Sequence, residues 1–187
     1  LALALLSYTP SDPSMNTVAG DHVKNVMQVP GAWVADFLLW LLGVPVALIL
    51  PLMAITARRL WGDQDMSGWK AQFGKCLIGI VLIGLALSLF QPDPLVGLPA
   101  GWGGVIALVF ARGIMSLSAQ LPAFQGWAIG ALVVLTLVAG LYVWYRSLAL
   151  ETFSELDRRR VLMRQPALDP ALEAQARLLR VLQEGEI

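Results

Sequence analysis

The chain has 187 residues, of which 57% are apolar and 14% charged, and its mean hydropathy is +0.68. Soluble domains carry about 45–50% apolar and about 25% charged residues, so this composition excludes an ordinary water-soluble domain. Thirteen Lys and Arg balance thirteen Asp and Glu, so the net charge gives no sign of a nucleic-acid surface. One cysteine, Cys76, excludes an internal disulfide, and one histidine, His22, leaves no Cys/His cluster for zinc.

The first apolar run, residues 1–6, is too short to cross a bilayer. As a helix it would extend about 9 Å, against a hydrocarbon core of about 30 Å. Because the chain also starts at Leu1 rather than at a methionine, we expect this run to be the end of a span that begins upstream in a longer protein. The loop that follows, residues 7–36, opens with a cluster of Pro, Ser and Asp that predicts ordered turns.

Three longer apolar runs, about 37–57, 73–90 and 127–145, predict membrane-spanning helices. Pro45 and Pro51 predict a kink in the first of these. Such prolines are tolerated in a membrane helix because neighbouring groups can hydrogen-bond the carbonyls that they leave free. With residues 1–6, the runs predict an all-α polytopic membrane protein with four transmembrane helices in a domain over residues 1–146.

Asp36 is expected near the N-terminal end of the second span, where the helix dipole stabilises a carboxylate; ion binding is the alternative. The second long loop, residues 91–124, contains apolar residues at helical spacing over residues 104–121. Arg112 interrupts this segment, and an unpaired Arg inside a membrane costs about 2.5–3.5 kcal/mol or more. We therefore predict an interfacial or re-entrant amphipathic helix there. The alternative is a fifth span, which would place the two ends of the chain on opposite sides.

Charge placement predicts the orientation of the four-span arrangement. Residues 58–75 and the tail from residue 146 lie on one side and hold eleven of the thirteen Lys and Arg. By the positive-inside rule this side is cytoplasmic, and the loops 7–36 and 91–124 are external. Residues 147–187 then form a cytoplasmic helical linker with a hinge at Gln165-Pro166 and a second, amphipathic helix that begins at Asp169-Pro170.

The sequence contains no catalytic, cofactor-binding or metal-ligating constellation. Gly74-Lys75-Cys76 resembles the end of a phosphate-binding loop, but Trp69 stands where that loop needs its first glycine and Cys76 where it needs a hydroxyl. His22 lies in a polar loop and is expected to be solvated. A small transporter or channel subunit remains the alternative class, although the predicted spans offer few polar residues for a pathway, namely Thr56, Ser88 and Thr136.

Small residues in the spans predict close helix packing. Gly43, Gly79 and Gly84 lie in the second and third spans, and Gly126 and Gly130 form a GxxxG pair in the fourth. Packing within one chain and assembly between chains are both open interpretations.

Two motifs that flank the first loop resemble a known family. The first is Ser7-Tyr8 with Pro10-Ser11-Asp12-Pro13-Ser14, and the second is Asn25 followed by Pro30-Gly31-Ala32-Trp33-Val34-Ala35-Asp36, ahead of Gly43; Gly103-Gly104-Val105-Ile106 matches as well. Over residues 1–146 the chain resembles the amino-terminal four-span membrane domain of FtsK/SpoIIIE-type bacterial DNA translocases.

The resemblance implies an inner-membrane protein of the division septum whose partners are the lipid bilayer and other cell-division proteins. It also implies a homo-oligomer, a hexamer, because the motor of such proteins is a ring. The full-length protein would be an ATP-driven double-stranded DNA translocase, while this fragment is not an enzyme. ATP and Mg, and contact with DNA, are expected only in a motor domain outside these residues.

Overall fold

The computed structural model describes residues 1–17, 22–62, 68–91, 97–98, 100–120, 122 and 124–148. The regular structure in these ranges is helical, which confirms the predicted all-α class. Leu1–Leu148 form one compact unit. Apart from residues 147 and 148, the helical linker predicted over residues 147–187 lies outside the described residues.

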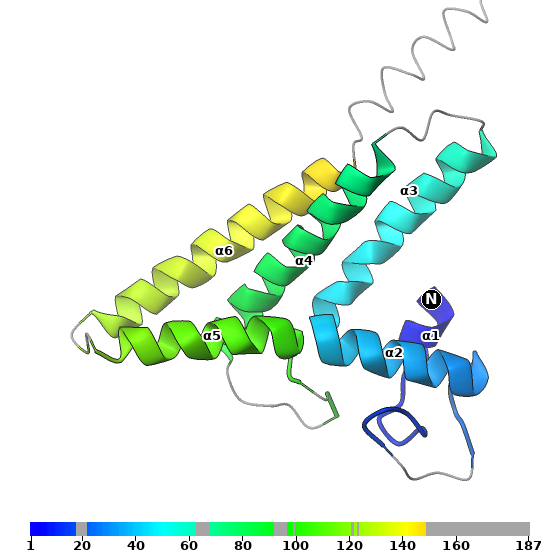
Figure 1. The fold of residues 1–187 in the computed structure, drawn as a ribbon, viewed down its shortest axis with the longest axis horizontal. Helices are drawn as coiled ribbons and strands as arrows, with labels where there is room; N and C mark the ends of the chain where they lie inside the picture. Colours follow the sequence, from blue (N-terminus) through cyan, green and yellow to red (C-terminus); the bar gives the residue numbers. More distant parts are fainter. Residues whose placement is uncertain are drawn as a thin grey trace, which may run out of the picture. The chain divides into compact units, whose positions relative to one another are not determined.

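Within the described residues, three stretches are long and apolar enough to cross a membrane. They are Val44–Trp61, which joins the 3-10 helix η1 (Val44–Leu48) to α3 (Ile49–Trp61), then α4 (Trp69–Phe90) and α6 (Gln125–Ser147). Their mean hydropathies are 1.4, 2.3 and 2.1. Figure 1 shows α3, α4 and α6 running alongside one another. The helices predicted over residues 73–90 and 127–145 are therefore confirmed, and each is a few residues longer than expected.

The helix predicted over residues 37–57 is wrong in its boundaries. The chain instead forms α2 (Gln28–Leu42), breaks at Gly43, and restarts as η1. Gly43 has φ 71° and ψ −165°, a conformation that is essentially restricted to glycine. The Val44 N–H leaves the helical pattern and donates to the Trp102 carbonyl at 2.9 Å. Residues 28–36, predicted as loop, are consequently helical.

Two shorter helices lie across one end of the long ones. They are α2 and α5 (Gly104–Ser118), with 15 residues each, and Figure 1 shows both lying across the bundle at that end. The helix predicted over residues 104–121 is thus present. A short helix, α1 (Ala2–Leu6), packs on α2, and α5 packs on α4 as well as on α2.

The long helices approach closely at small residues, with α4 in the centre. A Cβ on Gly79 would lie 2.9 Å from the Trp144 backbone nitrogen, and one on Gly140 would lie 3.0 Å from the Ile83 nitrogen, so α4 and α6 meet almost backbone to backbone. The Trp144 indole N–H donates to the Leu48 carbonyl at 2.9 Å, which ties α6 to the junction of η1 and α3.

Candidate functional site

The residues between α1 and α2 fold into a compact polar loop. We call this the polar loop, residues 7–27, of which residues 18–21 are not described. Three side chains at its base are almost completely buried: Asp12 and Asp36 are each 2% exposed and Asn25 is 1% exposed. Burying such groups is costly unless each is hydrogen-bonded, so their partners determine whether the site is built for structure or for chemistry.

Asp12 and Asn25 join the two ends of the polar loop. The backbone N–H groups of Lys24 and Asn25 donate to the two carboxylate oxygens of Asp12, at 2.9 and 2.8 Å. The Asn25 side-chain amide donates to the Ala4 carbonyl at 2.9 Å, and its Oδ1 accepts from the Met27 N–H at 3.0 Å. These bonds fix the start of α2 against the end of α1.

Asp36 anchors the polar loop to α2. Its Oδ1 accepts a hydrogen bond from the Tyr8 hydroxyl at 3.1 Å. Its Oδ2 accepts two from Asn16, one from the backbone N–H at 3.2 Å and one from the side-chain amide at 2.8 Å. Because α2 begins at Gln28, Asp36 lies more than two turns inside the helix, so the predicted stabilisation by the helix dipole is wrong. Loop donors stabilise the carboxylate instead.

Tyr8 shows the electrostatic effect of this arrangement. Burial raises the pKa of Tyr8 to about 12, and the negative charge of Asp36 and the hydrogen bond to it add to the increase. The hydroxyl therefore stays protonated and donating at every physiological pH. A proton-transfer role for this pair at neutral pH has no support.

The motif residues singled out in the sequence converge in this site. Tyr8, Asp12, Asn25 and Asp36 come from both motifs and lie together at the junction of α1, the polar loop and α2. Asn16 completes the set and was not predicted, because an Asn in a loop has no local signature of a bond across 20 residues. Across the described parts of the chain, no group of three or more His, Cys, Asp or Glu could hold a metal ion.

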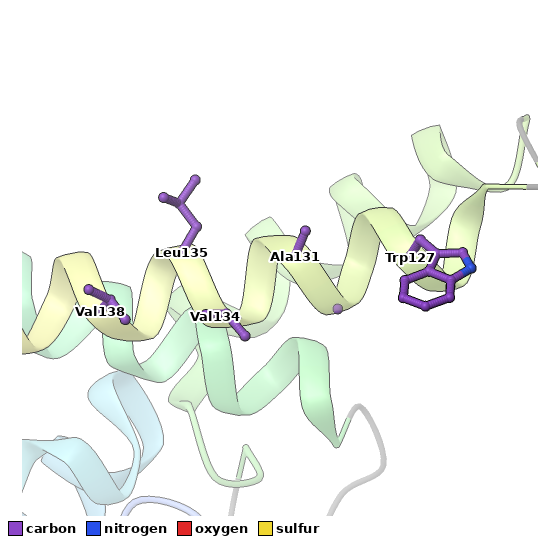
Figure 2. A pocket seen from close by; sticks show the side chains of 7 residues that line it. Trp127, Ala131, Val134, Leu135 and Val138 are labelled. Atoms are coloured by element: carbon purple, nitrogen blue, oxygen red, sulfur yellow. The ribbon is translucent and has the colours of Figure 1, made fainter.

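A second feature lies on α6, away from α4. Nothing stands within 4 Å of where a Cβ would lie on Gly126 or Gly130, in contrast to Gly79 and Gly140. The two glycines form the floor of an open apolar groove, and Figure 2 shows side chains along it. The other lining residues are Trp127, Ala131, Val134, Leu135 and Val138.

Polar groups inside the long helices bond to their own backbone. The Thr56 hydroxyl donates to the Leu52 carbonyl at 2.8 Å, and the Thr136 hydroxyl donates to the Leu132 carbonyl at 2.7 Å. Two of the three polar residues that a transport pathway would use are therefore engaged locally.

Basic side chains gather at the end of the bundle opposite the polar loop. There α3 ends, α4 begins and α6 ends, and we call this the basic end; the end with the polar loop is the loop end. The exposed cations of the basic end are Arg58, Lys70, Lys75 and Arg146.

Comparison with known proteins gives a consistent result. A family model described as the 4TM region of DNA translocase FtsK/SpoIIIE matches residues 1–145. The DNA translocase FtsK of Rickettsia typhi is 29% identical over 116 residues, which cover 60% of this chain and 15% of that protein. The DNA translocase FtsK of Caulobacter vibrioides is 32% identical over 106 residues, 54% of this chain and 12% of that protein. The chain thus matches a small part of each relative's length. No solved structure matches it.

Proposed function

Because the chain belongs to the family formed by the 4TM region of FtsK/SpoIIIE DNA translocases, we propose that it is the membrane anchor and division-site assembly module of a septal DNA translocase. The observation that carries this proposal is the family match over residues 1–145, which includes the polar loop. In the proposed protein, an ATP-driven motor outside these residues moves double-stranded DNA, and this module holds it at the closing septum of the inner membrane. ATP and Mg belong to that motor.

The proposed topology has the basic end in the cytoplasm and the polar loop outside. It is supported by the cations at one end of α3, α4 and α6, since positive loops stay cytoplasmic. The family description counts four spans, and we assign the fourth to the segment that contains α1. A domain with four spans then has both of its ends on the cytoplasmic side.

Cysteine labelling of intact cells tests this topology. His22 is exposed in the polar loop and Trp61 is 94% exposed at the basic end, while Cys76 is fully buried and serves as the unlabelled background. A membrane-impermeant maleimide should label a His22→Cys variant in intact cells and a Trp61→Cys variant only after the membrane is opened. The reverse pattern, or labelling of both variants in intact cells, would refute the orientation.

The division-site role is tested by imaging the chain fused at its C-terminus to a fluorescent protein in a rod-shaped bacterium. We expect a membrane signal enriched at midcell. Met15 is 47% exposed on the polar loop and makes none of the bonds to Asp12 or Asp36, so Met15→Glu changes only the surface offered to other division proteins. This variant should keep its membrane level and lose midcell enrichment. A uniform signal from the unchanged chain would refute the role.

We also place assembly between copies at the groove on α6. A GxxxG pair lets two helix backbones approach closely, and here the pair is open whereas Gly79 and Gly140 are occupied within the chain. Cross-linking in membranes should give oligomers up to the hexamer of the proposed ring. Gly130→Leu should reduce them, and Gly113→Leu, at an equally open glycine of α5, should not. Equal yields from both variants would exclude the groove.

A further inference from the structure

The exposed side of α2 is apolar and aromatic, which is unusual for a surface in contact with water. Trp33, Val34 and Phe37 are 48%, 47% and 43% exposed, and Val29 one turn earlier is 45% exposed. Asp36, the neighbour of Phe37, is turned about 100° around the helix and is buried under the polar loop. α2 therefore turns apolar and aromatic residues outward and a charged residue inward.

The length and the polar side of α2 exclude a transmembrane placement. Its 15 residues extend about 22 Å at about 1.5 Å per residue, which is short of a core of about 30 Å. A steep path would also carry Asp36 and the polar loop into the hydrocarbon, where irregular backbone exposed to lipid is not tolerated. The apolar side can reach lipid while the polar loop stays in water only if α2 lies along the membrane surface, with the polar loop above it.

α5 also exposes apolar and polar side chains on different sides of one helix. Phe110 and Leu117 are 58% and 68% exposed along one strip, while Arg112 and Ser116 are exposed along the neighbouring strip. The third side of the helix packs inward through Ala107, which is 1% exposed. Apolar and charged strips side by side on an exposed helix are typical of an amphipathic helix at a lipid–water interface.

The two helices are fixed to each other and to the spans. A Cβ on Gly43 would strike the backbone at Trp102 and Gly103, and one on Gly104 would strike the backbone of Leu41 and Gly43, so the end of α2 and the start of α5 touch without side chains between them. The Val44 N–H bond to the Trp102 carbonyl closes this junction. α2 and α5 therefore meet at one end of the helices that are long and apolar enough to cross a membrane, and Figure 1 shows both helices lying across that end.

We propose that α2 and α5 lie in the plane of the membrane, embedded in the single leaflet at the loop end, with lipid as the occupant of their exposed apolar faces. Trp33 and Phe37 of α2, and Phe110 and Leu117 of α5, contact the glycerol region and upper acyl chains. Arg112 and Ser116 reach the headgroups and water. The domain consequently displaces more lipid from this leaflet than from the other.

Fluorescence quenching in vesicles of phosphatidylethanolamine and phosphatidylglycerol tests the placement. Single cysteines are introduced as Phe37→Cys, Leu117→Cys, Ser116→Cys and Ile78→Cys, and each is labelled with the environment-sensitive dye NBD in the reconstituted chain. Emission is measured with iodide in the water and with nitroxide lipids that carry the quencher either near the headgroup or near the end of the acyl chain. The unaltered chain, in which Cys76 is fully buried, gives the background.

Dye at positions 37 and 117 should lose most emission to the shallow nitroxide and little to iodide. Dye at position 78, in the middle of α4 where Ile78 is 56% exposed, should lose most to the deep nitroxide. Dye at position 116, adjacent to 117 but on the polar strip, should lose most to iodide, and this pair is the internal control for a correctly folded α5. Deep quenching at position 37 would overturn the proposal in favour of a membrane-crossing α2. Quenching by iodide at 37 or 117, or by neither reagent, would overturn it in favour of a face exposed to water or covered by protein.

Discussion

Replacing Asp36 separates a structural role of its carboxylate from a role that needs its charge. The carboxylate accepts three hydrogen bonds, one on Oδ1 from Tyr8 and two on Oδ2 from Asn16. Asp36→Ala removes all three acceptor contacts. Asp36→Asn keeps an oxygen that can take the place of Oδ2, and its new NH₂ can donate to the Tyr8 hydroxyl oxygen, which accepts as readily as it donates.

The expected costs of the two substitutions follow from this difference. Bonds to a charged acceptor contribute about 1.5–3 kcal/mol each. The substitution also removes the cost of burying a carboxylate that is 2% exposed, which offsets part of the sum for the three bonds, and the freed donors of Asn16 and Tyr8 can reach water. We therefore expect Asp36→Ala to lower the free energy of unfolding by about 3 kcal/mol. Asp36→Asn loses only the charge assistance, about 1 kcal/mol, because the number of bonds is preserved.

Thermal unfolding of the purified chain in detergent measures the difference. For a domain of this size, about 1 kcal/mol shifts the Tm by roughly 2–4 °C, so Asp36→Ala should unfold about 10 °C below the unaltered chain and Asp36→Asn about 3 °C below it. Proteolysis within the polar loop should accelerate in the same order. Equal destabilisation by both variants would mean that the negative charge itself is required, as for a bound cation, and would refute the hydrogen-bond account. No destabilisation by Asp36→Ala would refute any anchoring role.

Three further predictions rest on other contacts of the same unit. The pKa of Tyr8 is raised from 10.0 to about 12, so its stabilising contribution is complete below pH 10 and lost as the pH rises towards 12; a Tyr8→Phe variant should lack this loss of stability in alkaline unfolding curves. Gly43→Ala should cost about 3 kcal/mol or more, because a Cβ meets the Trp102 carbonyl at a glycine-only conformation, whereas Gly113→Ala in open helix should stay within about 1 kcal/mol, as judged by Tm. Trp144→Phe removes one interhelical hydrogen bond and should cost about 1 kcal/mol, a Tm decrease of roughly 3 °C.

The number and type of long helices could be predicted from the sequence because each depends on a continuous apolar run. The break at Gly43 could not. Apolar residues continue on both sides of it, so the hydropathy of residues 37–57 is that of one span, and the glycine conformation is set by a contact with the Trp102 backbone far along the chain. Pro45 and Pro51 predict a kink within a helix and do not indicate that one helix ends before them.

The residues of the site could be predicted from their motifs, but the hydrogen bonds between them could not. Both motifs contain residues whose roles depend on partners 12 to 28 positions away, such as Asp12 with Lys24 and Tyr8 with Asp36. Hydrophobic periodicity does not reveal hydrogen bonds between residues so far apart in the sequence. The dipole interpretation of Asp36 failed for a related reason, since it assumed that the helix starts where the hydrophobic run starts, and α2 begins at Gln28.

The two features of the loop end depend on each other through consecutive residues of α2. Asp36 faces the polar loop and Phe37 faces outward, so the helix presents one side to hydrogen-bond donors and the other to lipid. If the polar loop unfolded while α2 stayed in the leaflet, a carboxylate would remain next to hydrocarbon without donors, which is far more costly than the same event in water. In a bilayer, α2 can therefore keep its position only while the polar loop is folded. It follows that a loss of the Asp36 bonds should also change how deeply Phe37 lies in the leaflet, so the quenching profile at position 37 should move towards iodide in an Asp36→Ala background and stay unchanged in Asp36→Asn.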